Sequence, residues 1–183
     1  VMTYNIHHGF DAAEKSDQLV NIARLIKSSG AELVGLQEVD SMCIRSGKVD
    51  QAKRLAELTG MYYAYVPHFP YEGGSYGLAV LSKFPVSGVE NNRLPFRGPQ
   101  GDETRALLTA RISVSSRKDI CFAVVHYSGQ IRLNQAEVTV ATLKSRNIPS
   151  ILTGDLNETP DSKVVQTLST YLQDTNQTTI KTV

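Results

Sequence analysis

The chain has 183 residues, of which 41% are hydrophobic and 20% charged, enough for one domain with a buried core. With 19 basic and 18 acidic residues the formal net charge is +1, so total charge gives no reason to expect a polyanionic partner. No apolar run is long enough to span a bilayer. Cys43 and Cys121 are too few and too far apart for a thiolate metal site, although one disulfide between them stays open. We expect a single domain over residues 1–183.

The first four predicted elements alternate between strand and helix. An alternating apolar pattern predicts a strand that ends at Asn5, and helical spacing predicts a helix capped by Ser16 and stopped by Gly30. A short apolar run then leads into Glu38, and a second helix follows it. The expected ranges are a strand over 1–6, a loop over 7–9, a helix between 16 and 30, a strand over 33–36 and a helix over 48–58.

The middle of the chain predicts antiparallel strands, and its last third returns to helix and strand. The expected strands cover 62–66, 78–81, 105–114 and 119–126, with a glycine-rich and aromatic loop over 67–75 and a hairpin turn over 115–118. Two helices near 133–143 and 164–172 flank a buried strand over 150–153. Gly154 is expected to end that strand, and Asp161 or Ser162 to cap the last helix.

This order of elements predicts the fold class. Helices cover sheets rather than alternate strictly with strands, which favours a mixed α/β sandwich over a barrel or a dinucleotide-binding fold. No Gly-x-Gly-x-x-Gly follows the first strand, so a nicotinamide or P-loop nucleotide site has no support.

The segment over 147–160 contains the first candidate for chemistry. Its buried strand delivers Asp155 and Asn157, and in extended chain the side chains of residues two apart lie on the same face. A carboxylate and an amide would then stand together at the rim of a sheet. An Asx turn leading into the next helix explains these two residues equally well, so the other strand ends must decide.

Polar side chains follow several predicted strands, at the positions where open sheets collect ligand-binding residues. The set has two carboxylates, two amides, one imidazole and no cysteine: Asn5, Glu38, His126, Asp155 and Asn157. Hard oxygen donors of this kind suit Mg²⁺, or Mn²⁺, better than Zn²⁺. The hypothesis is a metal-assisted phosphoester hydrolase. Taken singly, Glu38 could be a solvated loop carboxylate and His126 a strand-end histidine bonded to backbone.

Six short blocks resemble, in order, the signature blocks of the endonuclease/exonuclease/phosphatase superfamily. They are Tyr4-Asn5-Ile6, Leu36-Gln37-Glu38-Val39, Gly77-Leu78-Ala79-Val80-Leu81-Ser82, Arg105-Ala106-Leu107, Val125-His126-Tyr127 and Gly154-Asp155-Leu156-Asn157. That superfamily includes deoxyribonuclease-like nucleases, abasic-site endonucleases, inositol polyphosphate phosphatases and bacterial sphingomyelinases. The resemblance implies a deoxyribonuclease I-like fold, a four-layer sandwich of two packed mixed β-sheets flanked by helices.

The resemblance also implies roles for individual residues. Glu38 would be the principal Mg²⁺ ligand with Asn5 beside it, and Mn²⁺ could replace Mg²⁺. Asp155 would orient or activate the attacking water and Asn157 would hydrogen-bond the phosphate. His126, as a protonated imidazole, would donate to a phosphate oxygen as charge develops there.

Further candidates surround this set. Arg105 matches a family position near the phosphate, although a surface cation on a strand is nearly as good an explanation. Tyr76 and Tyr71 lie in the glycine-rich loop of a tyrosine-rich segment and are placed to touch substrate, while other tyrosines of that segment would be core. His7 and His8 follow Asn5 closely, and we expect them only to support the residues that contact the ion.

The chain departs from the family at its end, because the family's Ser-Asp-His block is absent. We expect the domain to be incomplete at the C-terminus, where residues 180–183 read as a strand that is cut off, and trimmed at the N-terminus. The alternative is a non-catalytic binding module that lacks the Asp-His base pair. A nucleic-acid-binding protein is a third hypothesis, but the cations are scattered, with only a modest excess over 93–118.

The expected partner is a phosphoester substrate: a small phosphodiester, a lipid head group or a nucleic acid. The same chemistry serves all three, and loops choose among them. We expect a monomer.

Overall fold

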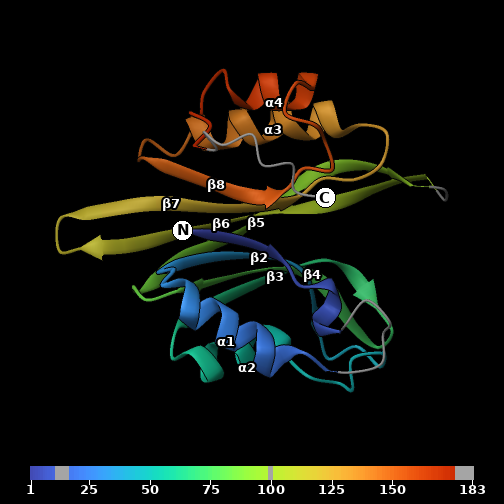
Figure 1. The fold of residues 1–183 in the computed structure, drawn as a ribbon. Coiled ribbons are helices and arrows are strands. Elements are labelled where there is room, and N and C mark those ends of the chain that lie inside the picture. Colours follow the sequence, from blue (N-terminus) through green and yellow to red (C-terminus); the bar gives the residue numbers. More distant parts are fainter. Residues whose placement is uncertain (11–16, 99–100, 176–183) are drawn as a thin grey trace.

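The computed structural model describes residues 1–10, 17–98 and 101–175. Two four-stranded sheets pack face to face, and helices cover the outer face of each sheet (Figure 1). Both sheets contain parallel and antiparallel pairs, so both are mixed. The predicted α/β four-layer sandwich is therefore confirmed.

The first sheet has the strand order β1-β2-β4-β3. β1 and β2 run parallel, whereas β4 runs antiparallel to both β2 and β3. Apolar side chains of the two helices pack on the outer face, with Ile26 and Leu55 against Leu36. The elements of this half are β1 (Met2–Asn5), the 3-10 helix η1 (His7–Gly9), α1 (Leu19–Ser29), β2 (Leu33–Ser41), α2 (Gln51–Thr59), β3 (Tyr62–Tyr71) and β4 (Gly74–Ser82).

The second sheet has the strand order β5-β6-β7-β8, and only its last pair is parallel. Its outer face is covered by α3 and α4, which pack through Ala136, Leu143 and Val164. None of the described helices is both long enough and apolar enough to cross a bilayer. The elements of this half are β5 (Val86–Gly98), β6 (Gly101–Ser115), β7 (Lys118–His126), α3 (Arg132–Lys144), β8 (Ser150–Asp155) and α4 (Lys163–Leu168).

A third apolar layer lies between the sheets. Leu78 and Val80 of β4 pack there with Leu108 of β6 and with Phe122 and Val124 of β7. Because β7 faces this layer on one side and α3 on the other, every residue over 120–125 is buried, as its apolar run predicts. Cys43 and Cys121 are buried and free, so the disulfide left open above does not form.

The loop expected over 67–75 is wrong. It is a hairpin in which β3 and β4 pair up to Tyr71 and Gly74 and turn through Glu72 and Gly73. The prolines of this segment argued for a loop, but β3 is the edge strand of its sheet, where a missing backbone N–H costs no ladder bond.

Strand β5 was not predicted at all. Its sequence shows no continuous apolar run, because it is an edge strand and carries polar residues such as Glu90, Asn91 and Asn92. Pairing with β6 along most of its length makes it a strand. Tertiary contacts thus decided an element that local pattern left open.

Smaller differences concern element ends. Helix α2 begins at Gln51 rather than 48, because the Asp50 side chain caps it by accepting from the Lys53 N–H at 3.1 Å. Ser162, not Asp161, caps α4. The predicted Ser16 cap and the strand start over 180–183 lie outside the described residues.

Gly154 does not end its strand, since β8 continues to Asp155. A glycine is needed there because a Cβ atom would lie 2.5 Å from both the Val125 Cγ2 and the Val125 carbonyl oxygen. This close approach holds β7 and β8 in the register that sets His126 opposite Asp155.

Candidate active site between the two sheets

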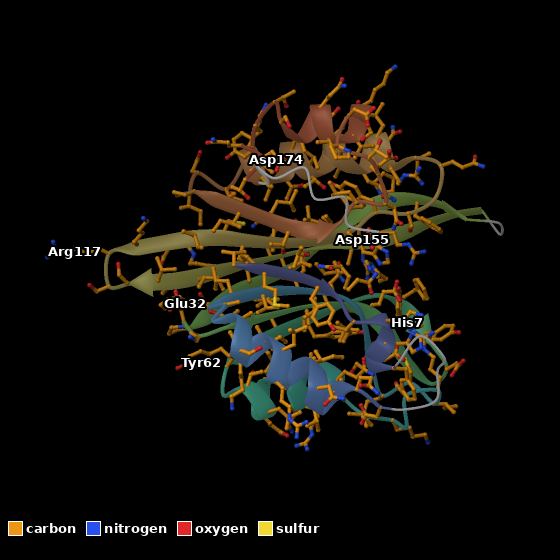
Figure 2. The ribbon with its side chains drawn as sticks, in the orientation of Figure 1. His7, Glu32, Tyr62, Arg117, Asp155 and Asp174 are labelled. Carbon is orange, nitrogen blue, oxygen red and sulfur yellow. The ribbon has the colours of Figure 1, made fainter. Side chains whose placement is uncertain are left out.

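Two parallel strand pairs, one from each sheet, end on the same side of the sandwich. In the first sheet Asn5 ends β1 opposite Gln37, and Glu38 follows at once. In the second sheet His126 ends β7 opposite Asp155 at the end of β8. Figure 2 shows Asp155, at the end of β8, and His7, which follows β1, at the same end of the molecule. The fold therefore gathers four of the predicted site residues.

The Asn5 amide joins the two sheets. Its Nδ2 donates to Glu38 Oε1 at 3.0 Å and to Asp155 Oδ2 at 3.2 Å. Its Oδ1 accepts from the His7 backbone N–H at 3.1 Å. Two carboxylates thus converge on one neutral amide group, which partly offsets their mutual repulsion.

The backbone at Glu38 explains why this side chain reaches the site. The pairing of β2 with β4 shifts register between Leu36 and Val39, and Glu38 has a positive φ of 58°. Glu38 therefore lies within β2, which continues to Ser41, and the expectation that the strand ends before it is wrong. A bulge of this kind re-aims the side chain inside the strand. Non-glycine residues rarely adopt positive φ, and such strain is commonly found at functional sites.

His126 is mostly buried and faces Asp155, with 3.9 Å between His126 Nε2 and Asp155 Oδ2. Burial lowers the pKa of His126, the Asp155 and Glu38 carboxylates oppose this shift, and the Arg105 cation adds to it. Without a bound anion, burial therefore favours the neutral imidazole. A phosphate bound beside it would raise its pKa, so the protonated imidazole expected from the sequence fits a substrate complex.

Asn157 lies in a turn rather than in extended chain. Its backbone N–H donates to Asp155 Oδ1 at 3.0 Å and its φ is 51°. The Asx turn considered above is therefore present, and the shared face predicted from extended chain is wrong because the backbone reverses after Asp155. The Asn157 Nδ2 donates to the Tyr127 carbonyl at 2.9 Å, and its second hydrogen can serve a ligand.

Arg105 and Tyr76 belong to a cluster beside His126 that we call the aromatic wall. Its aromatic residues are Phe69, Tyr71, Tyr76 and Phe96. The Arg105 guanidinium carbon lies 4.1 Å from the centre of the Phe96 ring and 4.9 Å from that of Phe69. Tyr76 packs on Phe69, with ring centres 5.5 Å apart. Burial first and then the Glu38 carboxylate raise the pKa of Tyr76, which Arg105 opposes. Both predicted substrate residues therefore lie near Glu38 and His126.

Tyr71 stands further out, at the tip of the β3–β4 hairpin. The Arg45 guanidinium carbon lies 4.6 Å from its ring centre and 5.5 Å from that of Tyr76. Arg45 is itself held by the fully buried Asp40 through two hydrogen bonds of 2.8 Å. This ion pair fixes the outer end of the aromatic wall.

His68 is a residue that sequence reasoning left without a role. It is buried under the site, its ring centre is 6.4 Å from that of His126, and its Nδ1 accepts the Ala106 N–H at 2.7 Å. Burial, reinforced by the cations of Arg105 and Arg93, holds the pKa of His68 well below its usual range. No local motif marks it, because its strand was expected to end before it.

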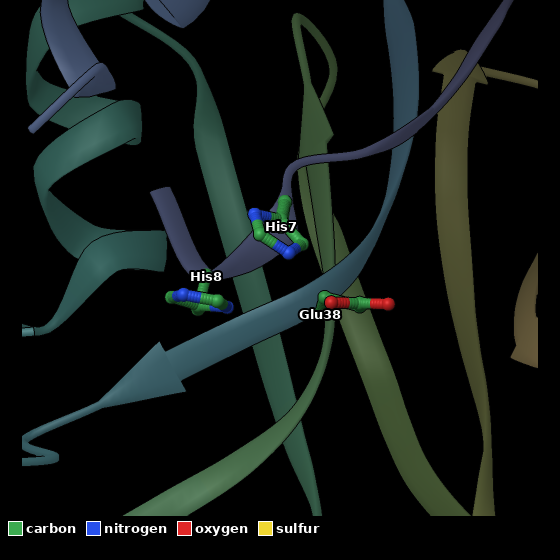
Figure 3. Close-up of side chains that lie close together, drawn as sticks. All are labelled: His7, His8 and Glu38. Carbon is green, nitrogen blue, oxygen red and sulfur yellow. The ribbon is translucent and has the colours of Figure 1, made fainter. Parts of the chain in front are cut away.

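His7 and His8 were expected only in support, yet they lie against Glu38. Possible ligand atoms of these three side chains all fall within 4.8 Å of one another, and Figure 3 shows both imidazoles beside the Glu38 carboxylate. Within the described ranges this is the one group of three or more His, Cys, Asp and Glu side chains with such spacing.

Comparison with known proteins identifies the family. Residues 2–181 match the model of the Endonuclease/Exonuclease/phosphatase family. The chain belongs to this family. Its members are phosphoesterases, including nucleases and phosphatases, so the site residues lie in a fold that is shared with phosphoesterases.

Individual relatives are distant. The chain is 26% identical over 170 residues to the uncharacterized protein YbhP of Escherichia coli K12, covering 86% of this chain and 66% of YbhP. A crystal structure of an endonuclease/exonuclease/phosphatase from Beutenbergia cavernae is similar with a TM-score of 0.69 at 25% identity, over 91% of this chain and 51% of that one. The mannosyl-6-phosphatase Bt3783 of Bacteroides thetaiotaomicron gives a TM-score of 0.64 at 15% identity, over 92% of this chain and 68% of that one. At 15% identity, the similarity to this phosphatase shows a shared fold alone.

Proposed function

We propose that this protein is a metal-dependent phosphoester hydrolase. The observation that carries the proposal is the convergence of Glu38 and Asp155, from different sheets, on one Asn5 amide beside His126. Two carboxylates brought this close are costly unless they are neutralised, which a divalent cation does better than a neutral amide.

The donor set fits a divalent cation. Glu38 would hold the ion through its carboxylate, and Asn5 could add its amide oxygen after turning that oxygen away from the His7 N–H. Oxygen ligands of this kind are what Mg²⁺ and Mn²⁺ accept. When bound, the ion would polarise a phosphoryl oxygen and offset the negative charge of the transition state.

The chain's own residues supply the remaining chemistry. Asp155 accepts a hydrogen bond from the attacking water, and its Oδ1 is held by the Asn157 N–H so that the carboxylate keeps one orientation. His126 donates from its ring to a phosphate oxygen, a bond that strengthens as negative charge develops. Asn157 offers the second hydrogen of its amide to the same group.

Substrate recognition falls to the aromatic wall and its cations. The Arg105 cation lies close enough to His126 to lower its pKa, and a positive charge there suits a phosphate. Tyr76 and Phe69 form an apolar surface beside it, which suits the organic group on that phosphate. Diesters and monoesters both meet this description. Because the similar structure from Bacteroides thetaiotaomicron is a mannosyl-6-phosphatase, a sugar phosphate is included among the substrates.

A hydrolysis panel tests the proposal. The substrates are bis-p-nitrophenyl phosphate, p-nitrophenyl phosphate, mannose 6-phosphate, duplex DNA and sphingomyelin, each with Mg²⁺, with Mn²⁺ and with a chelator. We expect at least one ester to be cleaved with a divalent ion and none with the chelator. Binding of these esters without turnover under every condition would instead favour the non-catalytic binding module.

A further inference from the structure

The turn after β1 carries two adjacent histidines in an unusual backbone conformation. His7 and His8 both have positive φ, 47° and 43°, and their ring centres lie 4.4 Å apart. Glu38, which lies against them, also has positive φ, so all three side chains of the cluster are presented from left-handed backbone. Strain repeated at three neighbouring polar residues persists only where the surrounding structure compensates for it.

That compensation is visible in the hydrogen bonds around η1. Gly9 N donates to Ile6 O at 2.9 Å, and Phe10 N donates to His7 O at 3.1 Å. The buried Gln51 side chain donates to His8 O at 2.5 Å, and its Oε1 accepts the Asp40 N–H at 2.9 Å. The histidine turn is thus tied through Gln51 of α2 to β2, the strand that carries Glu38. In functional metal sites, hydrogen bonds from surrounding residues hold the ligand side chains in place in this way.

The side chains also differ in exposure, as an open metal site requires. His8 is buried, Glu38 is half-buried and His7 is exposed, so an ion between them would be supported from below and open to solvent and substrate above. Three protein ligands with an open side are the usual composition of a catalytic metal site.

From this geometry we infer that His7 and His8 join Glu38 as direct ligands of the catalytic ion, and that the site prefers a transition ion such as Mn²⁺ or Zn²⁺ to Mg²⁺. The inference rests on the proposed function for the role of the ion, but not for its binding. The reason is donor chemistry: imidazole nitrogen binds transition ions well, whereas Mg²⁺ favours oxygen and retains its water. This changes the ligand set expected from the sequence, which contained oxygen donors alone at the ion.

The distances are compatible with closure around one ion. Ligand atoms that bind a single ion at about 2.0–2.2 Å lie no more than about 4.4 Å apart, so the present spacing within 4.8 Å needs only small side-chain rotations.

Pulsed EPR of the Mn²⁺ complex tests the inference independently of turnover. Protein carrying histidine labelled with ¹⁵N in the ring is compared with unlabelled protein. A nitrogen coupling to Mn²⁺ that changes from ¹⁴N to ¹⁵N between these two samples comes from imidazole. We expect such a coupling in the parent, weakened in His7→Gln and lost in His7→Gln/His8→Gln. Calorimetry on His7→Gln should show Mn²⁺ and Zn²⁺ affinity reduced at least about tenfold with Mg²⁺ affinity nearly unchanged.

His126→Gln is the matched control, since it removes a histidine from the same site but not from the cluster. It should keep the nitrogen coupling. Because His8 is buried, circular dichroism must first show that the double variant folds; His7→Gln, at an exposed position, carries the test if it does not.

Three results would overturn the inference. The parent could show no imidazole coupling, the coupling could be removed only by His126→Gln, or the protein could bind neither Mn²⁺ nor Zn²⁺. Failure of the proposed function looks different, because the coupling would then be present without hydrolysis of any ester. Hydrolysis with Mn²⁺ but without the coupling would leave the hydrolase standing and remove the histidine ligands.

Discussion

Asn5 and Asp155 are 150 residues apart in the chain, yet Asn5 Nδ2 donates to Asp155 Oδ2 across 3.2 Å and joins the end of β1 to the end of β8. The same amide nitrogen serves Glu38. The candidate site therefore does not belong to either sheet. It exists only where the two sheets meet, and a single neutral side chain separates its carboxylates.

Asn5→Ala removes this separation. Glu38 and Asp155 then face each other without a donor, and we expect the metal-free protein to lose about 1.5–3 kcal/mol of stability, the scale of hydrogen bonds to charged groups. Thermal unfolding with a chelator and with excess Mn²⁺ measures the effect. The ion should restore more stability in Asn5→Ala than it adds to the parent, and an equal gain in both proteins would argue against two carboxylates facing one ion.

Glu38→Gln keeps the shape of the side chain and removes its charge. Divalent-ion affinity, measured by calorimetry, should fall while the unfolding temperature of the metal-free protein stays nearly the same. Glu32→Gln is the control, because Glu32 is an exposed carboxylate at the other end of the molecule (Figure 2). Unchanged affinity in Glu38→Gln would remove Glu38 from the ligands.

Asp155→Asn should reduce turnover by about 10²–10⁴-fold, the usual contribution of general-base assistance. The amide keeps an oxygen for the Asn157 N–H, so the turn and the fold should survive. Asp119→Asn makes the same chemical change on the far end of β7, where Asp119 pairs with Arg111, and should leave the rate unaltered. Activity of Asp155→Asn equal to the parent would end the catalytic interpretation of Asp155.

Acid should destabilise the protein through His68 and His126. Both pKa values are lowered by folding, so below about pH 6.5 the unfolded chain binds more protons than the native protein. Stability is therefore full above that pH and is lost as the pH falls through the folded pKa values, by up to about 1.4 kcal/mol per pH unit for each histidine.

His68→Asn tests this origin of the acid sensitivity. The Asn Oδ1 can replace His68 Nδ1 as acceptor for the Ala106 N–H, while the titrating group is removed. Unfolding followed between pH 5 and 8 should then show a shallower pH dependence than in the parent. The same slope in both proteins would mean that other groups carry the acid sensitivity.

Much of the fold was determined by sequence patterns of short range. The apolar runs around Leu36, Val80, Val124 and Leu152 predict strands that are present, and helical spacing predicts the four α-helices seen among the described residues. These patterns suffice because each element must bury one face, and the burial period reveals its type. The fold class followed from the order of the elements and from the family blocks.

Edge strands and turns needed the tertiary structure. The polar face of β5 hides a strand that only its pairing with β6 establishes. The prolines in β3 favour a loop, but the segment pairs with β4. The backbone reversal at Asn157 follows from its hydrogen bond to Asp155. Backbone pairing over long separations leaves little trace in neighbouring residues.

The candidate site divides in the same way. The sequence by itself determined which polar residues follow the apolar strand runs, namely Asn5, Glu38, His126 and Asp155, although β2 continues past Glu38 to Ser41. Only the tertiary structure decided that Asn5 bridges both carboxylates, that His68 lies beneath His126, and that His7 and His8 reach Glu38. The physical reason is that strand ends follow from local burial, whereas distances between them follow from the packing of two sheets and from a bulge at Glu38 that no local pattern encodes.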